Sequence, residues 1–367
     1  MMPVHLFVDI SSHGFGHLAQ AAPVLDALAR LLPGLRLSIR SGLPLEKLRA
    51  RIGAPFESMT GRSDFGFVML DAMRVDRAAT GQAYRTFHAD WEARVAAEAT
   101  FLRDLGADWV LTDVAYLPLS GAVRAGLPAL SMCSLNWADL FAHFFGREAW
   151  AGPIHEQILA AYRGAESFIR LTPAMPMNDL PNARAVAPVA ALGRDCREYL
   201  RERIGAASDE RIVLIAFGGF DKDLRAAAWP VTPGVRYLVP AGWAVARSDM
   251  TAMETVRMNF TDLLCSVDAV LTKPGYGTFT EAARSGVSVL YVRRDDWPEQ
   301  DYLIEWLERN ARCREVAFAD VLNGEFGEVL ECLWRQTGSG GDSAVHWQEG
   351  AEEAARLIIA CLTSRSC

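Results

Sequence analysis

The stretch from Ser266 to Gln300 constrains the fold of this chain more than any other. It reads as a buried strand over Asp268–Thr272, a glycine-rich turn, and a helix that opens at Thr278 with Glu281 in its first turn. A second apolar strand follows over Val287–Val292. This alternation predicts an α/β fold. A glycine turn before a helix N-terminus also favours phosphate binding, because backbone N–H groups and the helix dipole attract negative charge.

Four residues of this turn and helix are candidates for contacts with a nucleotide. Gly275 and Gly277 let backbone N–H groups approach a phosphate closely. Thr278 adds a hydroxyl that can cap the helix or touch a phosphate oxygen. Glu281 is an acidic side chain of the kind that binds ribose hydroxyls. The same pattern also fits an ordinary βα link that holds no ligand.

A second glycine turn, Gly218-Gly219, follows the apolar strand Ile212–Phe217. The carboxyl ends of parallel strands lie at one edge of a sheet, and ligands of α/β proteins bind at that edge. We therefore expect this turn to face the same edge as Gly275, where the two turns can share one ligand.

The N-terminal end of the chain repeats the arrangement. The apolar strand Val4–Ile10 runs into Gly14 and Gly16, and His17 stands at or just inside the start of the next helix. A helix N-terminus disfavours the charged form of histidine, and a neutral imidazole can act as a general base. The alternative is that His13 or His17 caps the helix or packs against it.

Asp113 ends a third buried strand, Trp109–Thr112, which follows an amphipathic helix predicted over Thr86–Leu105. A carboxylate at the carboxyl end of a parallel strand lies on the ligand-binding edge of the sheet. Asp113 can therefore orient His17 and stabilise its charge, as in catalytic His–Asp pairs. The alternative role is an N-cap for the next helix.

The segment Gly61–Arg85 has no clear period, so it is either a binding loop or a solvated surface loop. Asp64 and Asp71 in this segment are candidates for acceptor binding. Trp137 belongs to an aromatic cluster that forms an apolar acceptor pocket, a weak membrane patch or, most commonly, plain core. His13 completes the set of acceptor candidates.

At 367 residues the chain has the length of two α/β domains. Two Rossmann-like domains facing across a cleft are predicted, one over residues 1–185 with Phe168–Leu171 as its last strand, the other over residues 186–345. Pro173–Pro188 has the composition of an interdomain linker. The last helix, in residues 346–367, is amphipathic and can cross back onto the first domain.

The formal net charge of −8 argues against a general affinity for nucleic acid. The seven cysteines follow no metal-binding spacing, and their odd number, without a secretory signal, predicts reduced thiols in the cytoplasm. No apolar run is long enough for a transmembrane helix. Peripheral membrane contact stays open, and the oligomeric state is unassigned.

Three segments carry a wider resemblance: HGFGHLAQAAPVLDAL near the start, TDVAYLPLSGAVRAGLPAL in the middle, and KPGYGTFTEAARSGVSVLYV with DDWPEQDYL near the end. They resemble the GT-B glycosyltransferases, the superfamily of the plant UDP-sugar transferases and the peptidoglycan N-acetylglucosaminyltransferase. HGFGH, KPGYGT and VRRD are similar, more narrowly, to the glycosyltransferase-like half of plant arabinokinases and to free-standing bacterial relatives. The resemblance covers nearly the whole chain.

The resemblance implies roles for individual residues. His17 matches the histidine that deprotonates the acceptor hydroxyl, and Asp113 matches the aspartate paired with it. Glu299 and Gln300 match the pair that holds the hydroxyls of the donor sugar. Phe260 matches the place where the backbone meets the nucleobase.

The donor turn matches less completely. Gly275, Gly277 and Thr278 match the diphosphate-binding turn of those families, and Glu281 matches the carboxylate that binds ribose. Lys273, however, stands where the plant signature has a histidine. A lysine can serve the phosphates electrostatically, but its presence leaves the donor open.

A transferase of this kind moves a sugar from a nucleotide donor, UDP-linked by default, to a hydroxyl of a small-molecule, lipid-linked or peptide-linked acceptor. A base opposite the leaving group inverts the anomeric centre. Neither a metal nor a cofactor besides the nucleotide sugar is expected, because helix dipole, backbone amides and Lys273 can stabilise the leaving diphosphate. Arg293 and Arg294 are candidates for contacts with an acidic sugar or a phosphorylated acceptor.

Two alternatives stay open. A nucleotide-sugar hydrolase or epimerase of the same fold releases nucleotide without an added acceptor. A nucleotide-sugar-binding module without catalysis, a partner of a sugar kinase, binds the donor without turnover. An NAD dehydrogenase is disfavoured, because the first loop reads HGFGH rather than GxGxxG and no fitting acidic residue follows about twenty positions on.

Overall fold

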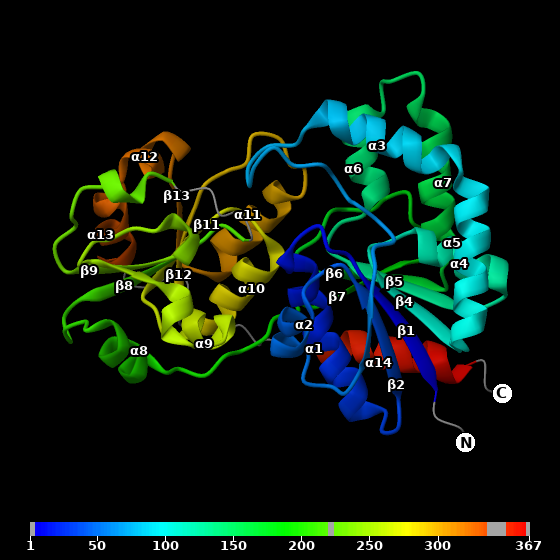
Figure 1. The fold of residues 1–367 in the computed structure, drawn as a ribbon, viewed down its shortest axis with the longest axis horizontal. Helices are drawn as coiled ribbons and strands as arrows, with labels where there is room; N and C mark the ends of the chain where they lie inside the picture. The colour runs from blue at the N-terminus through cyan, green and yellow to red at the C-terminus, as the bar shows by residue number, and fades with distance from the viewer. Residues whose placement is uncertain (1–3, 219–223, 336–349, 365–367) are drawn as a thin grey trace. The chain divides into compact units, whose positions relative to one another are not determined.

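Strands and helices alternate along the chain in a computed structural model that describes residues 4–218, 224–335 and 350–364 (Figure 1). The chain divides into two units, each with its own sheet. Unit 1 comprises residues 1–69, 75–189 and 348–367, and unit 2 comprises residues 70–74 and 190–347. The last helix thus belongs to unit 1.

Unit 1 is built on a seven-stranded, all-parallel sheet in the order β3-β2-β1-β4-β5-β6-β7. The central strands β1, β4 and β5 are buried at every position, as expected where helices cover both faces of a parallel sheet. The strands are β1 (His5–Ile10), β2 (Arg36–Ser41), β3 (Glu57–Thr60), β4 (Trp109–Asp113), β5 (Ala129–Cys133), β6 (Ser167–Leu171) and β7 (Ala183–Val186).

Helices cover both faces of this sheet. α1, α2 and α14 lie on one face, and α4, α5 and α7 lie on the other, as right-handed crossovers require (Figure 1). The helices are α1 (Phe15–Leu31), α2 (Leu45–Arg51), α3 (Arg77–Ala89), α4 (Trp91–Leu105), α5 (Leu117–Ala125), α6 (Trp137–Phe145), α7 (Ala151–Arg163) and α14 (Gly350–Ser364).

Unit 2 has a six-stranded, all-parallel sheet in the order β10-β9-β8-β11-β12-β13. Its strands are β8 (Arg211–Ala216), β9 (Val235–Val239), β10 (Met250–Ala252), β11 (Ala269–Thr272), β12 (Ser288–Tyr291) and β13 (Cys313–Glu315). Its α-helices are α8 (Arg197–Ile204), α9 (Phe260–Cys265), α10 (Tyr276–Ser285), α11 (Gln300–Asn310), α12 (Phe318–Asn323) and α13 (Gly327–Arg335). Short 3-10 turns occupy Ala226–Ala228, Ala241–Trp243 and Met253–Val256.

The core of unit 2 fills one face of its sheet. Inward side chains of β8 and β9 pack there against Trp229, Phe326 and the apolar side of α13. Met73, on the segment 70–74, is buried in the same core, which explains why this short segment counts with unit 2.

Both sheets share one strand order. In each, the first three strands run outward to one edge, and the fourth returns beside the first. This is the doubly wound Rossmann order, so the structure confirms the predicted α/β class with two parallel sheets. The order reverses between β1 and β4 in unit 1, and between β8 and β11 in unit 2.

Two predictions about unit 1 are wrong. Phe168–Leu171 belongs to β6, which is not the last strand of unit 1. β7 follows it within the expected linker and pairs with β6. β7 is a short edge strand with exposed positions, so it lacks the apolar run that marks a buried strand. The expected helix over Thr86–Leu105 is two helices, since α3 ends at Ala89 and α4 begins at Trp91.

The expected loop Gly61–Arg85 is also shorter than predicted. α3 begins inside it, at Arg77, and the Asp76 carboxylate caps the helix by accepting the Ala79 N–H. In unit 2 the edge strand β10 corresponds to no strand predicted from the sequence. Short edge strands have little apolar pattern, which is why sequence periodicity misses them.

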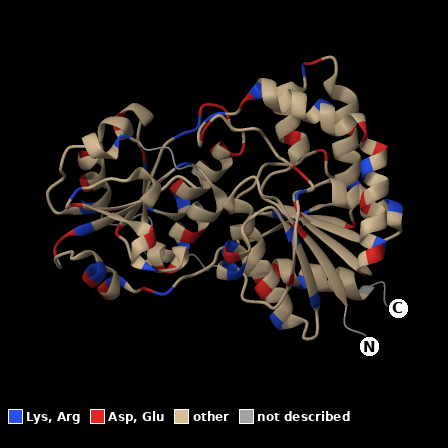
Figure 2. Ribbon diagram, in the orientation of Figure 1, with Lys and Arg blue, Asp and Glu red and all other residues tan. Residues whose placement is uncertain are grey.

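Charged side chains of both signs are interspersed along the helices and loops of each unit, and the central strands carry few of them (Figure 2). This distribution matches the burial of the strands. Within the residues described, no helix combines the length and apolar character needed to span a bilayer.

Candidate active site

The switch point of unit 1, between β1 and β4, is where open α/β sheets bind ligands. Ile10 pairs with Asp113 at the carboxyl ends of these strands. α1 begins just beyond, with Gly14 as its N-cap, no side-chain cap and no acidic residue in its first turn. A Cβ added at Gly14 or Gly16 would meet no described atom within 4 Å. The loop therefore leaves space above an uncapped helix end.

The central pair of this site is His17 and Asp113. The His17 ring nitrogen Nδ1 lies 2.8 Å from Asp113 Oδ1, and both side chains are buried. An ionised carboxylate can only accept, so Nδ1–H donates and Nε2 is left as the basic nitrogen. Burial raises the pKa of Asp113 above its usual value, and the charge and hydrogen bond of His17 oppose that rise.

A thiol completes this cluster. Cys133 ends β5, and its Sγ lies 3.8 Å from His17 Nδ1. The ligand atoms of His17, Asp113 and Cys133 all lie within 4.8 Å of one another, so nitrogen, oxygen and sulfur are close enough to hold a metal ion. The sequence did not single out Cys133. Its place at the end of a buried strand beside β4 is the signal that points to it.

Two of the acceptor candidates, Trp137 and His13, lie beside His17. The Trp137 ring centroid lies 5.7 Å from that of His17 and 5.3 Å from that of His13. Trp137 is fully buried, so it forms a wall of the site and is also part of the core. Its burial fits the core alternative, and the acceptor-pocket and membrane-patch alternatives stay predictions.

Asp64 holds that wall in place. Its carboxylate accepts the Trp137 Nε1–H at 2.8 Å and the Ser11 hydroxyl at 3.1 Å. Burial, aided by the nearby charge of Asp9, raises the pKa of Asp64 to about 6. Asp64 is thus a buried carboxylate whose oxygens are engaged with protein donors.

A buried ionic network lies beside Asp64. The Arg40 guanidinium donates to Asp9 at 2.5 Å and to both oxygens of Glu98 at 2.6 and 3.2 Å. Ser63 donates its hydroxyl to Asp9 at 2.7 Å. Burial opposes the charge of Arg40, yet Asp9 and Glu98 raise its pKa. The sequence signal for this network, a charged residue inside each of two apolar strands, was not used.

Asp71 is not brought to this site. It lies in segment 70–74, which counts with unit 2. Its carboxylate accepts the backbone N–H groups of Met73 and Arg74 and pairs with the Arg74 guanidinium at 2.7 Å. Asp71 therefore shapes its own turn.

The switch point of unit 2 lies between β8 and β11, where Ala216 pairs with Thr272. Lys273 follows directly, and a Cβ added at Gly218 would lie 3.9 Å from Lys273 Nζ. The lysine side chain therefore reaches Gly218. Burial lowers the pKa of Lys273 to about 7, helped by Arg294 and opposed by Glu299. Gly219 lies outside the described residues.

α10 begins beside this lysine. Gly275 is its N-cap, no side chain caps it, and no acidic residue lies in its first turn. The first intrahelical bond runs from Phe279 N–H to Gly275 O, so the N–H groups of Gly277 and Thr278 have no partner within the helix. The helix starts earlier than predicted, and Glu281, buried at 2% exposure, lies in its second turn.

The loop after β12 is closed by its own side chains. The Gln300 amide accepts the Arg294 N–H at 2.9 Å and donates to the Arg294 carbonyl at 3.0 Å. Trp297 donates its indole N–H to Glu299 at 3.1 Å, and Arg294 stacks on Trp297 at 3.9 Å. Burial lowers the pKa of Arg294 to about 10, opposed by Glu299. Gln300 thus fixes the loop that presents Arg294 and Glu299.

Phe260 and Arg293 are two further candidates in unit 2. Phe260 is the first residue of α9 and is partly buried. Arg293 forms exposed ion pairs with Asp301 at 2.6 Å and Glu315 at 3.0 Å. Of the two adjacent arginines, the buried Arg294 is therefore the one placed near Lys273.

Several solved structures that resemble the chain are glycosyltransferases. The calicheamicin glycosyltransferase CalG4 aligns over 98% of this chain and 95% of its own, with TM-score 0.61 and 18% identity. SnogD from Streptomyces nogalater aligns over 98% and 99%, with TM-score 0.56 and 16% identity. Medicago truncatula UGT71G1, solved with UDP-glucose, aligns over 98% and 95%, with TM-score 0.57 and 11% identity. The chain therefore has the GT-B fold, as predicted.

One relative is recognisable from sequence. The L-arabinokinase of Arabidopsis thaliana is 26% identical in an alignment of 337 residues that covers 88% of this chain. The match spans only 31% of the length of that relative. No protein-family model matches the chain.

Proposed function

We propose that the chain transfers a sugar from a nucleoside-diphosphate donor, UDP-linked in the first instance, to an acceptor hydroxyl. The observation that carries the proposal is the buried His17–Asp113 pair, 2.8 Å apart, at the switch point of unit 1. Asp113 holds the Nδ1–H, so Nε2 can take the acceptor proton as the oxygen attacks. The GT-B fold supports this function, and one structure that shares it was solved with UDP-glucose.

Unit 2 is proposed to hold the donor. The N–H groups of Gly277 and Thr278 at the start of α10 suit a diphosphate, and Lys273 beside them gains charge when an anion binds. The acceptor oxygen forms a bond to the anomeric carbon while the bond from that carbon to the phosphate oxygen breaks. Attack opposite the leaving group inverts the centre, and the proton passes to His17. Glu281 is proposed for the ribose hydroxyls and Glu299 for those of the sugar.

The acceptor is proposed to lie against His13, which is partly exposed and whose ring centroid lies 6.3 Å from that of His17. A flat imidazole beside the base favours an acceptor with a flat face. The proposed reaction uses no cofactor besides the nucleotide sugar, so turnover is expected to persist in EDTA.

A second candidate is a nucleotide-sugar-binding module that accompanies a sugar kinase. The match to a 31% share of an L-arabinokinase favours it, because the chain corresponds to one part of that larger protein. This candidate predicts donor binding without turnover.

The two candidates separate in one experiment. The full chain is incubated with UDP-glucose and other UDP-sugars, with and without an acceptor panel, and both UDP release and glycosylated product are measured. Transfer should fall by roughly a hundredfold or more in His17→Ala, whereas His143→Ala, exposed on α6, should behave as wild type. UDP release without acceptor would indicate hydrolysis, and binding without release would support the module.

A further inference from the structure

The amino-terminal edge of the unit 2 sheet holds a second polar site. A cavity of about 280 Å³ is lined there by Arg197, Arg211, Asp268, Arg312 and Trp334, among others. Arg211 begins β8, Asp268 directly precedes β11, and Arg312 directly precedes β13. The glycine turns and Lys273 follow the carboxyl ends of the strands. This cavity is therefore distinct from the proposed donor site.

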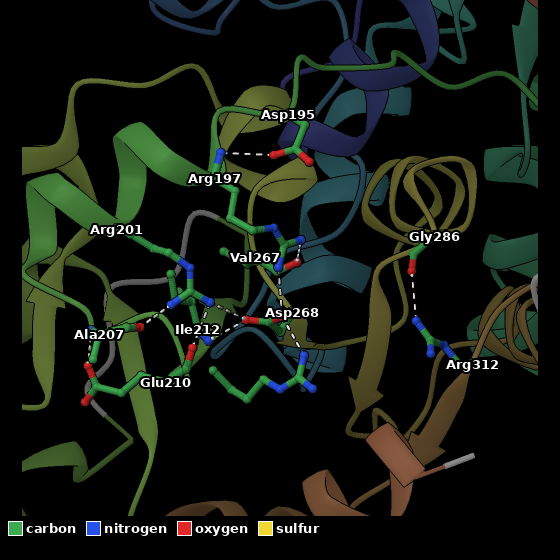
Figure 3. A network of polar contacts seen from close by, with 11 residues as sticks. Asp195, Arg197, Arg201, Ala207, Glu210, Ile212, Val267, Asp268, Gly286 and Arg312 are labelled. Atoms are coloured by element: carbon green, nitrogen blue, oxygen red, sulfur yellow. Dashed lines mark hydrogen bonds and ion pairs between the residues drawn. The ribbon is translucent and has the colours of Figure 1, made fainter. Parts of the chain in front are cut away.

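One carboxylate at this edge is shared by several arginines. Asp268, whose side chain is 5% exposed, accepts from Arg197 at 2.8 Å and Arg211 at 3.1 Å through Oδ1 (Figure 3). Its Oδ2 accepts the Ile212 N–H at 2.8 Å and lies 3.9 Å from Arg201. Three guanidinium groups thus surround one negative charge, which leaves a local excess of positive charge.

The other residues that line the cavity add hydrogen-bond donors and no acidic side chain. Arg312 donates to the Gly286 carbonyl at 3.3 Å, and within the described ranges it has no acidic partner (Figure 3). The Arg211 guanidinium lies 5.6 Å from the Trp334 ring centroid. The Trp334 indole N–H is buried, and no described residue accepts it. The cavity therefore combines surplus cationic donors with a buried, unsatisfied N–H.

We propose that this cavity binds a small phosphate-bearing anion. Guanidinium forks match phosphate oxygens in geometry and charge, and an indole N–H can donate to a further oxygen. The volume lies just below the usual range for small-molecule sites, so it suits a phosphate with a small organic body. The proposal does not depend on the proposed transferase activity.

Calorimetric titration of inorganic phosphate into the full chain tests the proposal. Wild type should bind phosphate, and the double variant Arg211→Gln/Arg312→Gln should lose that binding event by about tenfold or more in affinity. Lys273→Met should retain it, because Lys273 serves the opposite edge of the sheet. Arg309→Gln, an exposed arginine on α11 paired with Glu305, is the matched control and should bind as wild type.

Arg211 also supports Asp268, so Arg312→Gln alone is the second variant. It leaves the Asp268 cluster intact and should weaken phosphate binding severalfold without lowering the thermal stability. Absence of phosphate binding to wild type would overturn the proposal. Unchanged phosphate affinity in both Arg211→Gln/Arg312→Gln and Arg312→Gln would also overturn it, as would loss of all phosphate binding in Lys273→Met.

Discussion

At the scale of single residues, the candidate site of unit 1 is a set of buried groups held by hydrogen bonds. Asp113 fixes the Nδ1–H of His17, and Asp64 fixes the Trp137 wall beside it. The sequence allowed the first pair to be anticipated, because both residues follow the carboxyl ends of strands. The Asp64–Trp137 bond joins residues 73 positions apart, and no local pattern indicates it.

Replacing Asp113 by asparagine tests the first of these contacts. The amide can present an N–H to His17 and favour the wrong tautomer, so the turnover number should fall roughly a hundredfold to ten-thousandfold. Donor binding should stay unchanged, since it is assigned to unit 2. Steady-state kinetics together with donor titration measure both quantities. Unchanged turnover would show that Asp113 does not orient the base.

Asp64 gives a pH-dependent prediction. Its pKa is raised from 3.8 to about 6 by burial, so the folded protein holds this proton more tightly than the unfolded chain. The resulting stabilisation is complete below pH 3.8 and is lost as the pH rises through 6. Relative to Asp64→Asn, wild type should lose on the order of 3 kcal/mol of unfolding free energy between about pH 4 and pH 7.

Urea unfolding of both proteins across this pH range measures that difference. Asp104→Asn, on the exposed side of α4, is the control and should give a difference without this trend. A flat difference for Asp64→Asn as well would mean that Asp64 titrates in the folded protein as it does in the unfolded chain.

At the scale of elements, long or fully buried strands could be predicted and short edge strands could not. β4 and β11 were predicted to within one residue of their observed bounds, since both are buried at every position. β3, β7 and β10 have only four, four and three residues and were missed. Their place is decided by pairing with a neighbouring strand, which a local pattern does not contain.

The charged residues inside β1 and β2 make one element-scale prediction. Arg40→Met should destabilise unit 1 by roughly 3–5 kcal/mol, because it leaves Asp9 and Glu98 buried without their partner. Arg36→Met on the same strand should cost about 0–1 kcal/mol, since its pair with Glu57 is exposed. Chemical unfolding of the two variants measures the costs. Equal costs would show that the buried network contributes no more than a surface pair.

The start of α10 gives a second prediction at the scale of elements. Lys273 has a pKa lowered to about 7, so in most molecules this lysine is neutral above that pH. A bound diphosphate favours the charged form, and binding should therefore take up as much as about one proton at pH 8. Calorimetry in buffers of different ionisation enthalpy measures this uptake. Lys273→Met should abolish it, and uptake that persisted in the variant would assign the proton to another group.

At the scale of the whole molecule, one strand order occurs twice, and each copy places candidate residues at its switch point. This repetition explains why reasoning about the carboxyl ends of strands pointed to His17 with Asp113 in unit 1 and to the turns at Gly218 and Gly275 in unit 2. Lys273 was indicated by the family resemblance instead. The sequence could not show which polar groups are already engaged. Gln300 illustrates the limit, because its amide is engaged by the backbone of Arg294.

The central claim is that unit 2 binds a nucleoside diphosphate. The most direct test is calorimetric titration of UDP, GDP and dTDP into wild type, Glu281→Gln and Glu281→Ala. We predict that one nucleotide binds selectively to wild type. Both variants should lose about tenfold or more in affinity for that nucleotide, and Glu281→Gln should retain wild-type stability. If none of the three nucleotides bound to wild type, the glycine turn before α10 would be a structural link only, and the donor assignment would be contradicted.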